Sequence, residues 1–147
     1  MMSNFPSKYF LIFANSPESK VHHNNINAGL RIALTLVMDE VDVHILLTEE
    51  AIHLLRKSKQ KTEQLTLDKY GEQSNTEEGP LKVNDETSFT PYELIDGLIS
   101  FGAHIMTCKS SFTLTGLKEE DLVDGVDIVN LHSAIRIMMD CDKVLIF

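Results

Sequence analysis

The chain of 147 residues has no tryptophan, few cysteines and no cluster of basic residues beyond residues 56–61, which we interpret as a solvated helix end. Its 13 Lys and Arg stand against 22 Asp and Glu, which gives a net charge of −9. Nucleic-acid binders need clustered Lys and Arg to neutralise phosphates, so we expect no nucleic-acid partner. No apolar run approaches the ~20 residues that a membrane span requires, and we therefore expect no membrane partner.

The chain also lacks the features of a secretory signal, because its first residues have neither a basic start nor an apolar core. Its two cysteines, Cys108 and Cys141, both lie in or beside apolar segments. Free thiols are typical of reducing compartments. We therefore expect a cytoplasmic protein with unpaired cysteines.

Length and periodicity predict a single α/β domain over residues 1–147. Because strands alternate with helices along the chain, we predict a three-layer sandwich. Its mainly parallel sheet of about five strands would be flanked by helices. Continuous apolar runs of β-prone residues predict the strands at 9–14, 41–47, 103–107, 126–129 and 143–147. Helical patterns lie at 26–38, 49–57, 92–101 and 131–140, with shorter helical turns at 110–115 and 118–124.

Several residues have the chemistry of helix N-caps. Asn24 or Asn25 is expected to cap the helix at 26–38, and Thr48 the helix at 49–57. Thr90, followed by Pro91 at the first helical position, predicts the start of the next helix.

A polar insert at about residues 58–88 interrupts this pattern. It is rich in Lys, Gln, Glu, Thr, Asn and Ser and holds few large apolar side chains. Such a long polar stretch inside a compact domain is typical of a lid, an interface arm or a mobile segment. We expect at most a short helix or hairpin within it.

The strongest candidate for chemistry is Cys108, which lies where an apolar run gives way to Lys109, Ser110 and Ser111. This places a thiol at the carboxyl edge of a strand, where open α/β sheets bind ligands. Amides of the following helical turn and the adjacent lysine would favour the thiolate. The hypothesis needs an exposed sulfur atom. A buried cysteine that acts only as a small apolar residue remains an alternative.

Other polar residues are predicted at the same edge of the sheet. Asn15, His22 and His23 follow the first strand, and the histidines could offer a proton or a metal ligand. One cysteine and two adjacent histidines are too few for a zinc site, so we expect no metal. The glycines form no phosphate-binding motif, and we expect no cofactor.

The remaining histidines and the second cysteine are predicted to be structural. His44 and His132 are expected to be satisfied within a strand and a helix, and His104 to be packed with a smaller chance of tuning the thiol site. Cys141 has acidic neighbours and follows a helix carboxyl end, both of which raise a thiol pKa. It should be the inert cysteine.

The carboxyl-terminal half contains five short runs typical of one family: Gly102–Cys108, Gly116–Leu117, Glu119–Leu122, Gly125–Val126 and Asp142–Phe147. Their resemblance is to the DsrE/DsrF-like family, which includes the TusD-type subunits of sulfur-relay machinery. It covers residues 91–147 well and residues 9–38 loosely. It implies a single α/β domain that assembles as a homo-oligomer, a trimer or a hexamer.

The resemblance further implies that Cys108 carries a persulfide and exchanges it with a small sulfur carrier of the TusA type. Lys109, Ser110 and Ser111 would support the sulfur anion. Two alternatives stay open: a non-catalytic oligomeric binding module of the same fold, and a thiol redox sensor in which Cys108 is oxidised.

Overall fold

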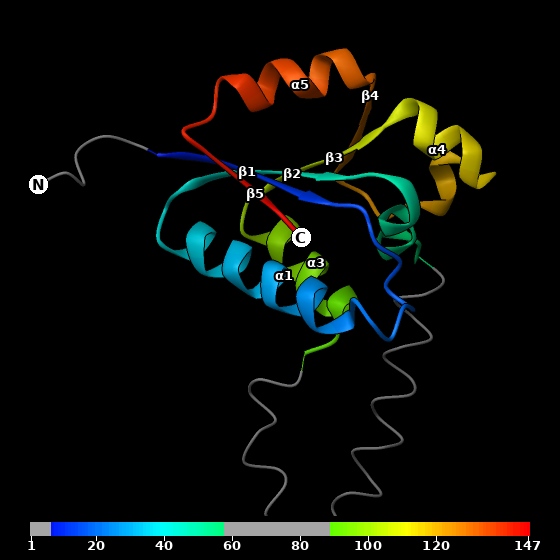
Figure 1. Ribbon diagram of the computed structural model, residues 1–147, viewed down its shortest axis with the longest axis horizontal. Helices are drawn as coiled ribbons and strands as arrows, with labels where there is room; N and C mark the ends of the chain where they lie inside the picture. Colours follow the sequence, from blue (N-terminus) through cyan, green and yellow to red (C-terminus); the bar gives the residue numbers. More distant parts are fainter. Residues whose placement is uncertain (1–6, 58–88) are drawn as a thin grey trace, which may run out of the picture.

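The computed structural model describes residues 7–57 and 89–147. These residues form alternating strands and helices that cover both faces of one sheet (Figure 1). The strands are β1 (Lys8–Phe13), β2 (Asp42–Leu47), β3 (His104–Cys108), β4 (Val126–Val129) and β5 (Lys143–Ile146). The α-helices are α1 (His23–Met38), α3 (Pro91–Ser100), α4 (Lys109–Thr115) and α5 (Leu131–Met139), and the 3₁₀ helices are η2 (Glu49–Leu55) and η4 (Glu119–Asp121).

The five strands form one parallel sheet in the order β4-β3-β2-β1-β5. The chain therefore moves from β1 outward to β4 and then returns through α5 to the other edge. Figure 1 shows α1 and α3 on one side of the sheet and α5 on the other. Right-handed crossovers require this arrangement, because reversing the direction of travel moves the connecting helix to the opposite face.

Alternation along the strands separates two apolar clusters. Odd-numbered side chains of β1 and β2, such as Leu11 and Ile45, pack with α1 and α3 in the larger cluster. Even-numbered ones, such as Phe10 and Leu46, pack with Ala134 of α5 in the smaller cluster. Within residues 7–57 and 89–147, α5 is the helix that covers the second face, and the edge of this face stays accessible to solvent. Ile146 on the edge strand β5 is 73% exposed.

The predicted fold class and strands are confirmed, with strand ends displaced by at most one residue. The strand predicted at 103–107 is β3 at His104–Cys108, so Cys108 is the last strand residue and not part of the following turn. The helix predicted at 49–57 is the 3₁₀ helix η2, which ends at Leu55.

The capping predictions had mixed outcomes. Thr90 caps the helix in front of Pro91 as predicted, and it also forms a capping box with Glu93. The prediction for Asn24 and Asn25 was wrong, because α1 already begins at His23. Thr48 precedes η2 but makes no side-chain cap; its hydroxyl is engaged with side chains of α4 and η2 instead.

The predicted polar insert at 58–88 lies outside the described residues, and its role as a lid stays a prediction. Within residues 7–57 and 89–147, none of the helices combines the length and the apolar character that crossing a bilayer demands.

Candidate functional site

Cys108 lies at the ends of two neighbouring strands, β3 and β4, whose following helices lie on opposite faces of the sheet. It ends β3 and pairs in register with Val129 at the end of β4. After β3, Phe112 of α4 packs against the larger cluster, whereas Ala134 of α5, after β4, packs in the smaller one. Ligands of open α/β sheets bind outside the carboxyl ends of strands at such a reversal. The topology therefore places the thiol at the expected ligand-binding edge.

The thiol itself is buried. Cys108 is 2% exposed and belongs to the smaller cluster together with Met106 and Ala134. The expectation of an exposed sulfur was wrong, because alternation along β3 turns residue 108 to the face that α5 covers. Its Sγ lies 3.1 Å from Oγ of Ser110, which is exposed. One serine side chain thus links the buried sulfur to the surface.

Hydrogen-bond donors lower the pKa of Cys108 in spite of its burial. Burial has the largest single effect and raises the pKa, but the Ser110 hydroxyl and the Ser111 backbone amide lower it, followed by the Ser111 hydroxyl and the Ser110 amide. The net shift is downward from the ordinary thiol value. Lys109 is exposed, and the main lowering effects come from the two serines. Donated hydrogen bonds therefore stabilise the thiolate.

Ser111 also connects the thiol site to the carboxyl end of β2. Its Oγ lies 2.9 Å from Thr48 Oγ1 and donates to Glu49 Oε2 at 3.1 Å. Glu49 has a φ of 52°, in the left-handed region, which costs a non-glycine residue about 1–2 kcal/mol. A hydroxyl carries one proton, so Ser111 donates either to this carboxylate or to the sulfur.

The sequence analysis missed Thr48 and Glu49 as parts of this site. The available signal was their position directly after β2, which is the neighbour of β3 in the sheet. Parallel neighbouring strands end at the same edge, so residues that follow β2 lie beside those that follow β3.

Comparison with known proteins agrees with this architecture. Residues 7–147 match the DsrE/DsrF-like family over nearly the whole chain. The chain belongs to the DsrE/DsrF-like family. Its relatives include uncharacterized protein MJ0989 of Methanocaldococcus jannaschii, 26% identical over 95% of this chain and 99% of the relative. Uncharacterized protein MK0008 of Methanopyrus kandleri is 26% identical over 81% of this chain and 78% of the relative.

Two solved structures share the fold of this DsrE/DsrF-like chain. The ychN protein from E. coli has a TM-score of 0.66 at 20% identity, covering 96% of this chain and 99% of that one. Protein MTH1491 of unknown function from Methanobacterium thermoautotrophicum has a TM-score of 0.57 at 13% identity, covering 97% and 100%. At these identities the likeness concerns the fold alone.

Asn15, His22 and His23 are not brought to the thiol of this DsrE/DsrF-like chain. Asn15 follows β1, His22 precedes α1 and His23 is the first residue of α1. This helix packs on the sheet face opposite to the Cys108 side chain. Within the described part of the chain, none of the three forms a hydrogen bond or ion pair with Cys108. No hydrogen bond or ion pair in the described part of the chain supports their predicted role beside Cys108.

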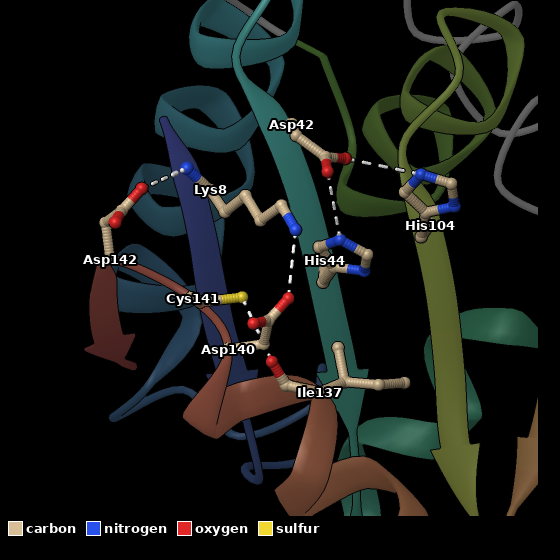
Figure 2. A network of polar contacts seen from close by, with 8 residues as sticks. All are labelled: Lys8, Asp42, His44, His104, Ile137, Asp140, Cys141 and Asp142. Atoms are coloured by element: carbon tan, nitrogen blue, oxygen red, sulfur yellow. Dashed lines mark hydrogen bonds and ion pairs between the residues drawn. The ribbon is translucent and has the colours of Figure 1, made fainter. Parts of the chain in front are cut away.

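Cys141 has the opposite environment, at the amino edge of the sheet (Figure 2). Its Sγ donates to the carbonyl oxygen of Ile137 at 3.3 Å. Burial raises the pKa of the Cys141 thiol, and the carboxylates of Asp140 and Asp42 raise it further. The predicted upward shift is confirmed, which leaves Cys108 as the thiol with the greater thiolate character.

Proposed function

We propose that this DsrE/DsrF-like protein is a sulfurtransferase-like sulfur-relay protein that carries a persulfide on Cys108. It would receive sulfur from a persulfide donor and exchange it with a small sulfur carrier of the TusA type. The observation that carries the proposal is a thiol at the sheet reversal whose pKa is lowered by serine hydroxyls and amides although it is 2% exposed.

The proposed transfer is a displacement that conserves electrons. The Cys108 thiolate attacks the outer sulfur of the donor persulfide, a bond forms between Sγ and that sulfur, and the donor leaves as a thiolate. An acceptor thiolate later attacks the Cys108 persulfide in the same way. Negative charge stays on sulfur throughout, and the donors from Ser110 and Ser111 stabilise it.

Access to the buried sulfur would come from the carboxyl edge. Ser110 is exposed and its Oγ lies 3.1 Å from Sγ. A rotation of this serine side chain is the smallest movement that opens a path to the thiol. Exposed Lys109 lies beside it and offers a positive charge to an incoming anionic sulfur.

The test is mass spectrometry after incubation with a small persulfide donor. We expect the peptide that holds Cys108 to gain the mass of one sulfur atom, and the gain to disappear in Cys108→Ser. Cys141→Ser is the matched control and should be loaded like the unaltered protein. Equal, slow loading of both cysteines, or none on Cys108, would contradict the proposal.

The burial of Cys108 supports one alternative, a binding module of the same fold in which the thiol only packs. In that case Cys108→Ser changes neither sulfur loading nor partner binding. A redox sensor is the other alternative, and it predicts that peroxide traps a sulfenic acid or a linked dimer at Cys108. The loading experiment and a peroxide titration separate the three.

We further propose a cytoplasmic homo-oligomer, either a trimer or a hexamer. Apolar side chains exposed on the α5 side of the sheet support this assembly: Met139 is 76% exposed, Ile146 73% and Val144 42%. Residues of this kind on an edge strand are typical of surfaces that another copy covers.

A further inference from the structure

A second cluster of side chains suited to ligand binding lies at the amino edge of the sheet, away from Cys108. Asp42 and His44 belong to β2, and His104 is the first residue of β3. The parallel register pairs His44 with His104. All three side chains point to the α5 side of the sheet, and Figure 2 shows them close together.

The two histidines share one carboxylate. His44 Nε2 lies 3.4 Å from Asp42 Oδ2, and His104 Nε2 lies 3.3 Å from Asp42 Oδ1. The imidazole rings stack with their centroids 4.5 Å apart. One ligand atom from each residue lies within 4.8 Å of the other two. The three residues therefore bring two nitrogens and one oxygen together from two strands.

The two distances between the Asp42 carboxylate and the imidazole nitrogens, 3.4 Å and 3.3 Å, are close to the spacing of ligand atoms around a zinc ion. Metal–ligand bonds of about 2.0–2.1 Å in tetrahedral geometry place neighbouring ligand atoms about 3.3 Å apart. The side chains are 17%, 37% and 57% exposed for His44, Asp42 and His104, so an ion can enter from solvent. Nδ1 of His44 is buried without a partner, which leaves Nε2 as the nitrogen that this ring offers.

Neighbouring groups do not complete a larger set of ligands. The carboxylate of Asp140 is engaged by Lys8 Nζ at 2.9 Å, and the Cys141 thiol donates to a backbone carbonyl. Two histidines and one carboxylate with open positions are the donor set of catalytic zinc sites and of other divalent transition-metal sites.

We propose that Asp42, His44 and His104 bind a divalent transition-metal ion such as Zn²⁺, with the fourth position open to water or an external ligand. The site is separate from the thiol, because His104 and Cys108 lie about 13 Å apart along β3. It joins β2 to β3 and does not depend on any sulfur chemistry at Cys108.

The test is titration of the full chain, free of any affinity tag, with Zn²⁺ by calorimetry and with Co²⁺ by visible absorption. We expect one equivalent to bind and Co²⁺ to give the absorption of a four-coordinate site. His104→Gln and Asp42→Asn should each weaken binding at least about tenfold, since even outer-shell changes cost that much. His132→Gln removes an exposed histidine of α5 and should bind like the unaltered protein.

Cysteine variants exclude a thiol site. Cys108→Ser and Cys141→Ser should retain full binding, and no sulfur-to-cobalt charge-transfer band should appear. His104 is 57% exposed, so His104→Gln should keep its circular dichroism spectrum, which separates lost ligation from lost folding. The proposal would be overturned if metal binding were unchanged in His104→Gln and Asp42→Asn, or if it were lost in Cys141→Ser. The cluster would then contain only ordinary histidine–aspartate hydrogen bonds.

Discussion

At the level of single residues, Cys108 and Cys141 differ in the direction of their pKa shift because their hydrogen-bond partners differ. Both pack against the same apolar cluster. Cys108 receives hydrogen bonds from the start of α4, whereas Cys141 donates to a carbonyl and faces carboxylates. Burial raises the pKa in both cases, so the sign of the net shift depends on the donors.

Ser110→Ala should raise the pKa of Cys108, measured as the midpoint of its alkylation rate against pH. The substitution removes the largest of the effects that lower this pKa. A hydrogen bond to a charged group contributes about 1.5 kcal/mol. The fraction of thiolate at neutral pH should therefore fall about tenfold, and the midpoint of the alkylation rate against pH should move upward.

Lys109→Ala is the matched control for that measurement. The main effects on the Cys108 pKa come from burial and from the donors of Ser110 and Ser111, so removal of the Lys109 charge should move the alkylation midpoint less than Ser110→Ala does. If both variants moved the midpoint equally, the assignment of thiolate stabilisation to the serine would be wrong.

At the scale of elements, α1 lies close to the sheet at a single glycine. A Cβ atom on Gly29 would lie 2.7 Å from Phe13 Cε2 and 2.7 Å from Phe147 Cγ. These two rings are stacked with centroids 5.1 Å apart. The close approach ties α1 to the first strand and to the end of the chain.

Gly29→Ala should therefore destabilise the protein. Overpacking costs about 1–3 kcal/mol, which outweighs the gain of up to about 1 kcal/mol from the better helix propensity of alanine. Chemical denaturation should show a lower free energy of unfolding. Gly97→Ala in α3 is the control: its nearest neighbour is Leu34 Cδ1 at 3.8 Å, so it should be neutral or stabilising. Equal effects of the two variants would disprove the packing argument.

For the whole molecule, the two ends of the sheet carry different chemistry. The carboxyl edge holds Cys108 with its serine donors, and the amino edge holds the Asp42–His44–His104 cluster. The edge strand β5 presents exposed apolar side chains to the surroundings. A parallel sheet separates these two groups of side chains because its strand ends lie on opposite sides of the molecule.

Ile146→Lys should dissociate the proposed homo-oligomer. Ile146 is 73% exposed, so the change is tolerated in a single copy but places a charge in an apolar contact between copies. Light scattering coupled to size exclusion should report a multimer for the unaltered protein and a smaller species for the variant. Lys143→Glu, also on β5, is a control for charge alone. A monomer in both proteins would contradict the proposed assembly.

Features that depend on neighbours along the chain could be predicted from the amino-acid sequence. Apolar runs and helical spacing identified the strands and the α/β class, because these periodicities are properties of each segment. The Thr90 cap also followed from residues only a few positions away. The raised pKa of Cys141 followed from them only in part, because burial is its largest cause and Asp42 of β2 contributes beside Asp140.

The contacts between residues across the sheet could be identified only from the three-dimensional fold. The burial of Cys108 depends on the face of the sheet that α5 covers. The hydrogen bond from Ser111 to Glu49 and the pairing of His44 with His104 each join segments about 60 residues apart. Strand order and register set these contacts, and both result from packing of the complete chain, which no local pattern records.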